Sequence, residues 1–200
     1  MDKKILWVGL GALALIVLVA LVVVIASQNN HLRGSVIDPP LPASEIVLTD
    51  QNGQPFRLSE YRGKVVLLFF GYTYCPDVCP ATMAELRAAR AMLKPEQAAR
   101  VQVVFITVDP ARDTPEAIQE YVTRFDPTFI GLSGSERELS RVWADYGVFR
   151  ELGIPNESGN YEVSHTARVY VVDVNGNLSL SFAFGASPED VANDLRILLK

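Results

Sequence analysis

The stretch KVVLLFFGYTYCPDVCP, Lys64–Pro80, reads as a buried strand that runs directly into the only two cysteines of the chain. Residues 64–70 form an unbroken apolar run of strand length, which is typical of a central strand covered on both faces. A helix is predicted immediately afterwards, over Cys79–Leu93, because its apolar residues recur at helical spacing. Cys75 and Cys79 therefore lie in the turn between a central strand and the helix that follows it.

Strands and helices alternate through the middle of the chain. Val101–Val108 is a second buried strand, and Thr114, followed by a proline and a glutamate, marks the start of a helix. The elements expected after it are a strand at Phe129–Leu132, a helix at Ser135–Tyr146, strands at Arg168–Val172 and Leu178–Phe182, and a helix at Pro188–Leu199. A hairpin is expected at each end, the first over residues 45–58, whereas residues 147–164 are expected to be irregular.

This order, β-β-β-α-β-α-β-α-β-β-α, predicts an α/β fold with one mixed sheet and helices on both faces. Ligands of such sheets bind beyond the carboxyl ends of the strands. Both cysteines follow the carboxyl end of the strand at 64–70. The predicted fold therefore places them at a binding edge of the sheet.

The composition is that of a globular protein with one domain. The 200 residues are 49% hydrophobic and 20% charged, and the formal net charge is −5. A chain with this charge and with scattered lysines and arginines has no basic surface for phosphate backbones. Nucleic acid is therefore not expected among its partners.

Residues 5–26 form an uncharged apolar segment of 22 residues, and about 20 are needed to cross a hydrocarbon core about 30 Å thick. A single-pass transmembrane anchor is predicted. The alternative is a signal peptide cleaved near Ala26, but the apolar regions of signal peptides reach only about 15 residues. Lys3 and Lys4 precede the segment and acidic residues follow it, which predicts residues 1–4 in the cytoplasm and residues 27–200 outside the cytoplasmic membrane, in a bacterial periplasm or at the cell exterior.

Residues 27–44 are polar and then rich in proline, so they are predicted to form an extracytoplasmic linker. Residues 45–200 remain for one domain. An extracytoplasmic compartment oxidises thiols, so a lone cysteine pair there forms a disulfide or is held by a metal or a reductant. A disulfide that closes so short a loop restricts the unfolded chain little, and a purely structural bridge is therefore a poor explanation of this spacing.

One helical turn from Cys75 to Cys79 would place their Cα atoms about 6 Å apart on one face. That separation suits a disulfide and equally suits two sulfur ligands on one metal, so the spacing leaves both open. With two cysteines and two histidines in the chain, the supply of ligands for a structural zinc site is short. Two thiolates and one imidazole instead form a soft set that suits copper, Cu(I) especially. His165 is the candidate imidazole, although in isolation it is better explained as a surface histidine.

Two further residues near the cysteines have simpler explanations than metal binding. Asp77 is interpreted as an acid at the positive end of a helix. Met83, at helical spacing among leucine and alanine, is interpreted as part of the core. Neither is expected to be a metal ligand.

Four blocks of the sequence resemble one known family. They are TYCPDVCP at Thr73–Pro80, VDPARDTP at Val108–Pro115, FIGLSG at Phe129–Gly134 and SHTARVYVVD at Ser164–Asp173. In this order they resemble the Sco/SenC proteins, membrane-anchored copper chaperones with a thioredoxin-like fold that act in the assembly of cytochrome c oxidase. The resemblance covers residues 44–200 and implies a thioredoxin-like mixed sheet for that domain.

The resemblance implies that Cys75 and Cys79 are copper ligands, that His165 is the third ligand, and that copper is bound as Cu(I) and as Cu(II). It implies a metallochaperone, rather than an enzyme, that delivers copper to the binuclear copper site of cytochrome c oxidase subunit II. Another periplasmic copper chaperone or a thiol reductant would be a further partner. The alternative is a thiol-disulfide reductase of the cysteines of that site, with Cys75 and Cys79 as its redox pair. Asp109 and Asp113 of the VDPARDTP block could contribute to the site or to partner binding, but from the residues alone they are interpreted as turn and cap residues.

The chain also differs from related classes of protein. Ser164 stands where many Sco/SenC proteins carry an acidic residue, which puts in doubt a supporting role for that position. A general thiol oxidoreductase of the same fold usually has two residues between its cysteines and a cis-proline before the next strand, but this chain has three residues and no proline beside His165. A peroxidase needs an activated cysteine beside a threonine and an arginine; Thr73 is close, but no arginine is suitably placed nearby in the sequence. An inert binding module does not explain the compact thiol pair.

Overall fold

The computed structural model describes residues 7, 11, 13, 15–21 and 31–200. The chain divides into two units, residues 1–32 and 33–200, and the second contains all of the described strands. The predicted anchor, residues 5–26, lies partly outside the described residues, and the predicted cytoplasmic residues 1–4 lie wholly outside them. No helix in the described part of the chain is long and apolar enough to cross a membrane.

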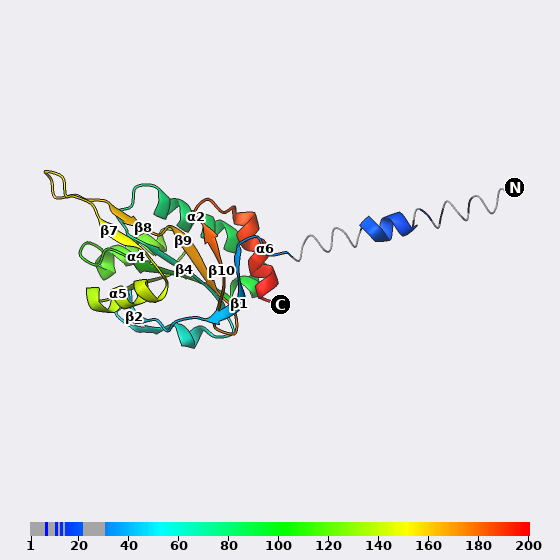
Figure 1. Cartoon of the computed structure of the whole chain (residues 1–200), viewed down its shortest axis with the longest axis horizontal. Helices are drawn as coiled ribbons and strands as arrows, with labels where there is room; N and C mark the ends of the chain where they lie inside the picture. The colour runs from blue at the N-terminus through cyan, green and yellow to red at the C-terminus, as the bar shows by residue number, and fades with distance from the viewer. Residues whose placement is uncertain (1–6, 8–10, 12, 14, 22–30) are drawn as a thin grey trace. The chain divides into compact units, whose positions relative to one another are not determined.

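The domain of residues 33–200 is built on one mixed sheet of eight strands (Figure 1). In spatial order the strands are β1 (Ser35–Pro42), β10 (Asn177–Ala183), β9 (Arg168–Val172), β4 (Val65–Gly71), β5 (Val101–Thr107), β6 (Ile130–Ser133), β2 (Val47–Asp50) and β3 (Pro55–Arg57). β4, β5 and β6 are parallel to one another, and the other neighbouring pairs are antiparallel. The predicted mixed sheet and both terminal hairpins are confirmed.

Helices cover both faces of this sheet. They are α2 (Val78–Ala91), α3 (Pro95–Ala98), α4 (Pro115–Thr123), α5 (Glu136–Asp145) and α6 (Pro188–Leu198), with a 3-10 turn, η1, at Leu58–Tyr61. β4 and β5 are buried along their whole length, as their unbroken apolar sequences require. Phe105 packs against Tyr121 of α4, whereas Phe70, on the opposite face of the sheet, packs against Tyr146 at the end of α5.

The predicted linker contains a strand that the sequence pattern does not reveal. Ser35–Pro42 forms β1, an edge strand paired antiparallel with β10. Its prolines are tolerated because one side of an edge strand has no ladder partner. The buried carboxylate of Asp194 in α6 accepts hydrogen bonds from the backbone N–H groups of Arg33 and Gly34 at 2.8–2.9 Å. The folded domain therefore begins near residue 33 rather than at residue 45.

Residues 147–164 are also more regular than predicted. β7 (Arg150–Leu152) and β8 (Val163–His165) pair antiparallel as a separate two-stranded ribbon. The loop that joins them, residues 153–162, projects from the domain (Figure 1). Each strand has only three residues, too few to show an alternating pattern in the sequence. His165 is therefore the last residue of a strand and not part of an irregular loop.

Candidate functional site

The candidate site lies where the ends of three neighbouring strands meet. Gly71, the last residue of β4, is in register with Thr107, the last residue of β5. β9 runs antiparallel to β4, so that Phe69 near the end of β4 lies opposite Val169 near the start of β9. The segments that follow β4 and β5 and the segment that precedes β9 therefore converge at one edge of the sheet.

The cysteines lie in a tight turn that leads into α2. Cys75 donates its backbone N–H to the carbonyl of Tyr72 at 3.2 Å, and Cys79 donates its backbone N–H to Sγ of Cys75 at 3.3 Å. α2 begins at Val78, so Pro80 lies in the first helical turn, where its missing N–H costs nothing. Both thiols are free, and Cys75 is half-buried whereas Cys79 is fully buried. The predicted turn before a helix that begins near Cys79 is confirmed.

Gly71 leaves room for the sulfur of Cys79. A Cβ atom at this position would lie 2.9 Å from Cε2 of Phe105, closer than real Cβ atoms approach such neighbours, and 3.0 Å from Sγ of Cys79, tighter than most real Cβ contacts. Any larger residue would displace the thiol or the aromatic core beneath it. The absence of a side chain at Gly71 therefore sets how closely Cys79 packs against β4.

His165 faces the same thiol from the other side of the site. Its Nε2 lies 3.6 Å from Sγ of Cys79, and its Nδ1 lies 3.2 Å from the carbonyl oxygen of Thr166. A carbonyl oxygen only accepts, so this contact requires a proton on Nδ1, and in the tautomer that carries its single proton there Nε2 keeps its lone pair on the side of the sulfur. The rings of Phe69 and Tyr72 meet the imidazole edge-on, at 6.5 and 5.9 Å between centroids. The segment that carries the cysteines and the segment that carries His165 therefore meet at this edge of the sheet.

The pKa values of the two thiols are shifted in opposite directions. The hydrogen bond from Cys79 lowers the pKa of Cys75 to about 4, with a smaller contribution from His165 and despite partial burial. The same hydrogen bond and strong desolvation raise the pKa of Cys79. Cys75 is therefore a thiolate at neutral pH and Cys79 is a buried thiol that donates to it.

This difference predicts an unusual pH dependence of thiol alkylation. Because the thiolate is the reacting form and the pKa of Cys75 is lowered to about 4, the alkylation rate of Cys75 with iodoacetamide should fall by less than about threefold from pH 7.5 to pH 5.5. An ordinary thiol with a pKa near 8.5 should lose nearly 100-fold over that range. Peptide mapping identifies the modified residue, and a loss of reactivity parallel to that of free cysteine would contradict the proton arrangement.

An open hollow gives access to the site. It has a volume of about 330 Å³ and is lined by, among others, Tyr72, Cys75, Glu162 and His165. Cys79 lies beneath it, out of contact with solvent. A molecule that enters the hollow therefore meets the thiolate of Cys75 and the imidazole of His165 before the buried thiol.

The geometry can be compared with known proteins. The sequence model of the family described as SCO1/SenC matches residues 39–200. The chain belongs to the SCO1/SenC family. An SCO2-like protein of Rickettsia felis is 35% identical over 150 residues, which cover 74% of this chain and 73% of that protein.

Solved SCO1/SenC structures share the fold. Bradyrhizobium japonicum ScoI with copper bound has a TM-score of 0.72 and 38% identity, over 78% of this chain and 99% of that chain. Apo Sco1 of Thermus thermophilus also has a TM-score of 0.72, with 39% identity over 84% of this chain and 95% of that chain. The mixed sheet of residues 33–200 is therefore the thioredoxin-like fold of this family.

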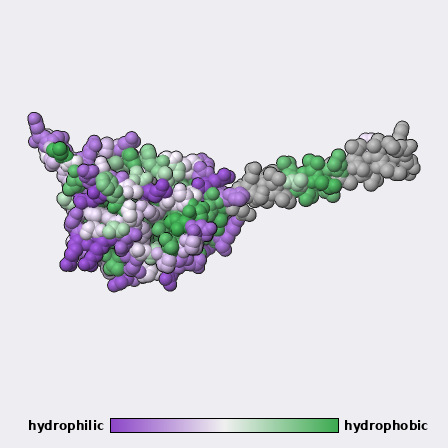
Figure 2. Space-filling view, in the orientation of Figure 1, coloured by the Kyte–Doolittle hydropathy of each residue, from purple (hydrophilic) through white to green (hydrophobic). Residues whose placement is uncertain are grey.

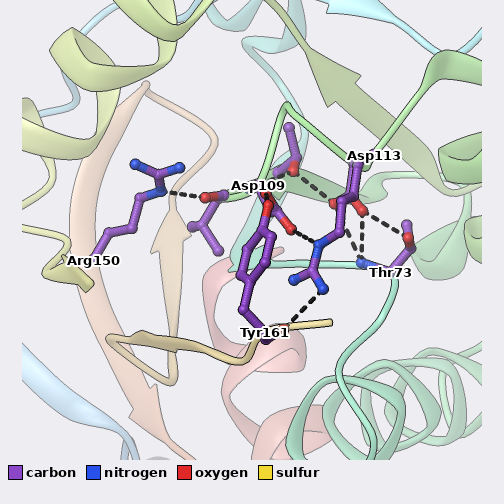
Figure 3. A network of polar contacts seen from close by, with 8 residues as sticks. Thr73, Asp109, Asp113, Arg150 and Tyr161 are labelled. Carbon is purple, nitrogen blue, oxygen red and sulfur yellow. Dashed lines mark hydrogen bonds and ion pairs between the residues drawn. The ribbon is translucent and has the colours of Figure 1, made fainter. Parts of the chain in front are cut away.

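The segment after β5 supports the site in ways that the sequence does not predict. Asp113 is almost fully buried, and its carboxylate accepts hydrogen bonds from the backbone N–H and the hydroxyl of Thr73 and from the hydroxyl of Thr107, the last two at 2.6 Å (Figure 3). Asp109 is also fully buried and contacts Arg112 and Tyr161. The interpretation of both aspartates as turn and cap residues misses these contacts, and the cap of α4 is Thr114. The presence of two aspartates within the short VDPARDTP block is the only sign in the local sequence that they share a role.

Three other residues near the site add no candidate ligand to it, although Asp77 and Ser164 line the hollow and the backbone of Asp77 hydrogen-bonds to Cys75. Asp77 is exposed at the position that precedes α2, and its side chain makes no capping hydrogen bond. Met83 is completely buried in the core, as predicted. Ser164 is exposed and pairs through its backbone with Glu151. The candidate set in this SCO1/SenC domain is therefore limited to the two cysteines and His165.

The donor types fit a soft metal, although the set is not preassembled. Among the residues that the structure describes, no three His, Cys, Asp or Glu side chains are already arranged as a metal site. Sγ of Cys79 lies 3.6 Å from Nε2 of His165, and the proton of Cys79 is donated to the Cys75 thiolate. A metal would therefore replace the proton that Cys79 now shares with Cys75, which couples binding to proton release.

Proposed function

We propose that this chain binds copper through Cys75, Cys79 and His165 and delivers it during assembly of cytochrome c oxidase. The observation that supports this most directly is the convergence of the three side chains, with Sγ of Cys79 3.6 Å from Nε2 of His165. The copper-bound ScoI of Bradyrhizobium japonicum supports copper as the metal. Membership of the SCO1/SenC family supports a role in the assembly of cytochrome c oxidase.

The donor set explains how both oxidation states could be carried. Two thiolates suit Cu(I), which accepts low coordination numbers, whereas Cu(II) gains from the added imidazole nitrogen. His165 is oriented for this role because its Nδ1–H is tied to the carbonyl of Thr166, the arrangement common among metal-binding histidines. Copper is the cargo of such a site, so the ligands must also release it.

The proposed recipient is the binuclear copper site of oxidase subunit II. Cys75 and His165 line the open hollow and Cys79 lies beneath it, so an incoming thiol can displace the two outer ligands first and the buried sulfur last. We also propose that residues 5–26 anchor the chain in the cytoplasmic membrane with the domain on the periplasmic side. A periplasmic copper chaperone would then supply the metal.

A thiol-disulfide reductase of the same copper site is the second candidate, and the lowered pKa of Cys75 favours it. The Cys75 thiolate would attack a substrate disulfide, release one substrate thiol and form a mixed disulfide. Cys79, after losing its proton, would then attack Sγ of Cys75 and release the second thiol. The product is a Cys75–Cys79 disulfide, and a periplasmic thiol reductant must supply two electrons to restore the pair.

A His165→Ala substitution separates the two candidates. In the reduced full-length chain it should weaken Cu(II) binding by at least the roughly 10- to 100-fold that loss of a supporting contact costs. Cu(I) binding should change much less, since both thiols remain. The measurement is competitive titration with a chelator for each oxidation state, and His31→Ala, which changes the other histidine of the chain, is the matched control.

The same variant is informative in a thiol-exchange assay with a model disulfide peptide. Reductase activity that survives His165→Ala while Cu(II) binding is lost supports a histidine-independent redox pair. Cu(II) affinity equal to that of the unaltered chain would contradict the ligand role of His165.

A further inference from the structure

We propose that Arg112 is a positioning residue that holds the His165 segment against the end of β5 and so keeps the imidazole in contact with Cys79. This inference rests on the proposed function, because it concerns the third ligand of the same site. It assigns a task to two residues, Arg112 and Tyr161, that lie outside the candidate ligand set.

The contact is a closed ring of three residues, which we call the Arg112 clamp: Asp109, Arg112 and Tyr161. Figure 3 labels Asp109 and Tyr161 of this ring. Nε of Arg112 pairs with Oδ2 of the fully buried Asp109. Nη1 of Arg112 donates to the carbonyl oxygen of Tyr161 at 2.8 Å, and the guanidinium lies 3.6 Å from the centroid of the Tyr161 ring. The hydroxyl of Tyr161 donates to Oδ1 of Asp109 at 2.8 Å, which completes the ring.

The clamp acts on a segment that has few other attachments. The loop at residues 153–162 projects from the domain, its outer end is largely hydrophilic in Figure 2, and Ile154 within it is 95% exposed. At the start of the ribbon, Arg150 donates to the carbonyl of Val108 and pairs with Glu136. At the other end of the loop, Tyr161 attaches the chain to Asp109 and Arg112. Both ends of the segment at residues 150–161 are therefore attached to the residues that follow β5.

Tyr161 lies on the chain segment that carries the imidazole, whereas Arg150 is paired with His165 across the ribbon. Tyr161 precedes His165 by four residues, which in extended chain span about 13 Å, and β8 begins between them. The sequence from Tyr161 into β8 therefore behaves as a short arm with the clamp at one end and the imidazole at the other. Release of the clamp would leave His165 held by its pairing with β7, by the buried Val163, whose backbone hydrogen-bonds to Tyr72, and by its own contacts.

Arginine is required for this contact by geometry. Its planar guanidinium can pair with a carboxylate, donate to a carbonyl and stack on an aromatic ring at the same time, whereas the ammonium of lysine cannot stack in this way. Arg112→Lys keeps the positive charge beside the buried Asp109 and removes the planar fork. The substitution therefore tests the clamp without leaving the buried carboxylate uncompensated.

The test compares Arg112→Lys with Arg90→Lys in the full-length chain. Arg90 pairs with Asp126 at 2.9 Å and has a side-chain exposure of 20%, close to the 17% of Arg112, but it lies near the far end of α2. The first measurement is amide hydrogen exchange without copper. In Arg112→Lys the amides of Gly153 and Thr166, which are hydrogen-bonded across the ribbon, should exchange about tenfold faster or more. Those of β4 and β5, and all of these amides in Arg90→Lys, should be unchanged.

The second measurement is copper affinity in each oxidation state. Arg112→Lys should weaken Cu(II) binding about 10- to 100-fold and change Cu(I) binding by less than about threefold, because Cu(I) keeps both thiolates. A clamp with only a general structural role would lower both affinities together. Tyr161→Phe, which removes only the hydroxyl contact with Asp109, is a second variant and should show the same pattern to a smaller extent.

Unchanged exchange at Gly153 and Thr166 would overturn the clamp whatever the copper result. Faster exchange with equal losses of Cu(I) and Cu(II) affinity would overturn its role in placing His165. If the unaltered chain binds no copper, the proposed function fails, while the exchange measurement still decides whether the clamp holds the ribbon.

Discussion

Replacing both Cys75 and Cys79 with serine is expected to abolish Cu(I) binding by the reduced chain. Serine hydroxyls are hard, weakly acidic donors, whereas Cu(I) requires soft thiolate ligands. His165 alone remains, and one imidazole on a half-buried strand end does not retain the metal. The expected loss exceeds about 1,000-fold, well above the 10- to 100-fold effect of removing a supporting contact. Titration against a Cu(I) chelator measures it.

The matched control for this double substitution is Asp77→Ala. Asp77 is exposed, lies between the two cysteines and makes no capping hydrogen bond. Its removal should leave Cu(I) affinity within about threefold, because neither thiol is altered. Copper binding that survives the double serine substitution would place the metal elsewhere, and a large effect of Asp77→Ala would make this carboxylate a ligand after all.

The second large effect is expected from Asp113→Ala. This carboxylate is almost fully buried and accepts three hydrogen bonds from Thr73 and Thr107. Its removal leaves those donors without an acceptor, and each unsatisfied buried group costs about 1–3 kcal/mol. We expect the free energy of unfolding of the copper-free chain to fall by about 3 kcal/mol or more. Denaturant titration measures the change.

Asp113→Asn distinguishes the shape of this side chain from its charge. Asparagine keeps one acceptor, and its amide can donate to a threonine hydroxyl, so the loss should be below about 1.5 kcal/mol. Burial raises the pKa of Asp113, although the threonine hydrogen bonds partly offset this. The group therefore favours the folded state most at low pH, and its contribution is lost as pH rises through its raised pKa. Asp113→Asn should remove that part of the pH dependence, and an alanine variant as stable as the unaltered chain would contradict the account.

Much of the fold could be predicted because its central elements carry strong local patterns. The apolar runs of β4 and β5 have one explanation, two buried parallel strands, and Thr114 caps α4 as its sequence indicates. β1 could not be predicted in the same way. Its proline-rich sequence resembles a linker, and it is ordered by partners remote in sequence, namely β10 and the carboxylate of Asp194.

The candidate site, like the fold, could be predicted where its signals are local in the sequence and not where they depend on contacts between remote residues. The spacing of Cys75 and Cys79 and their place after a central strand are local features, and by themselves they indicate chemistry rather than a structural bridge. The link to His165 requires tertiary information, because 86 residues separate it from Cys79; only the family resemblance supplies it. The contacts of Asp113 with Thr73 span 40 residues, and no local pattern encodes them.

The most direct test of copper binding by this thiol pair is one titration of the full-length chain with Cu(I), performed on the reduced protein and on protein oxidised to the Cys75–Cys79 disulfide. We expect about one copper ion bound per reduced chain and none per oxidised chain, because the disulfide removes both thiolates. Equal binding by the two forms would contradict this expectation.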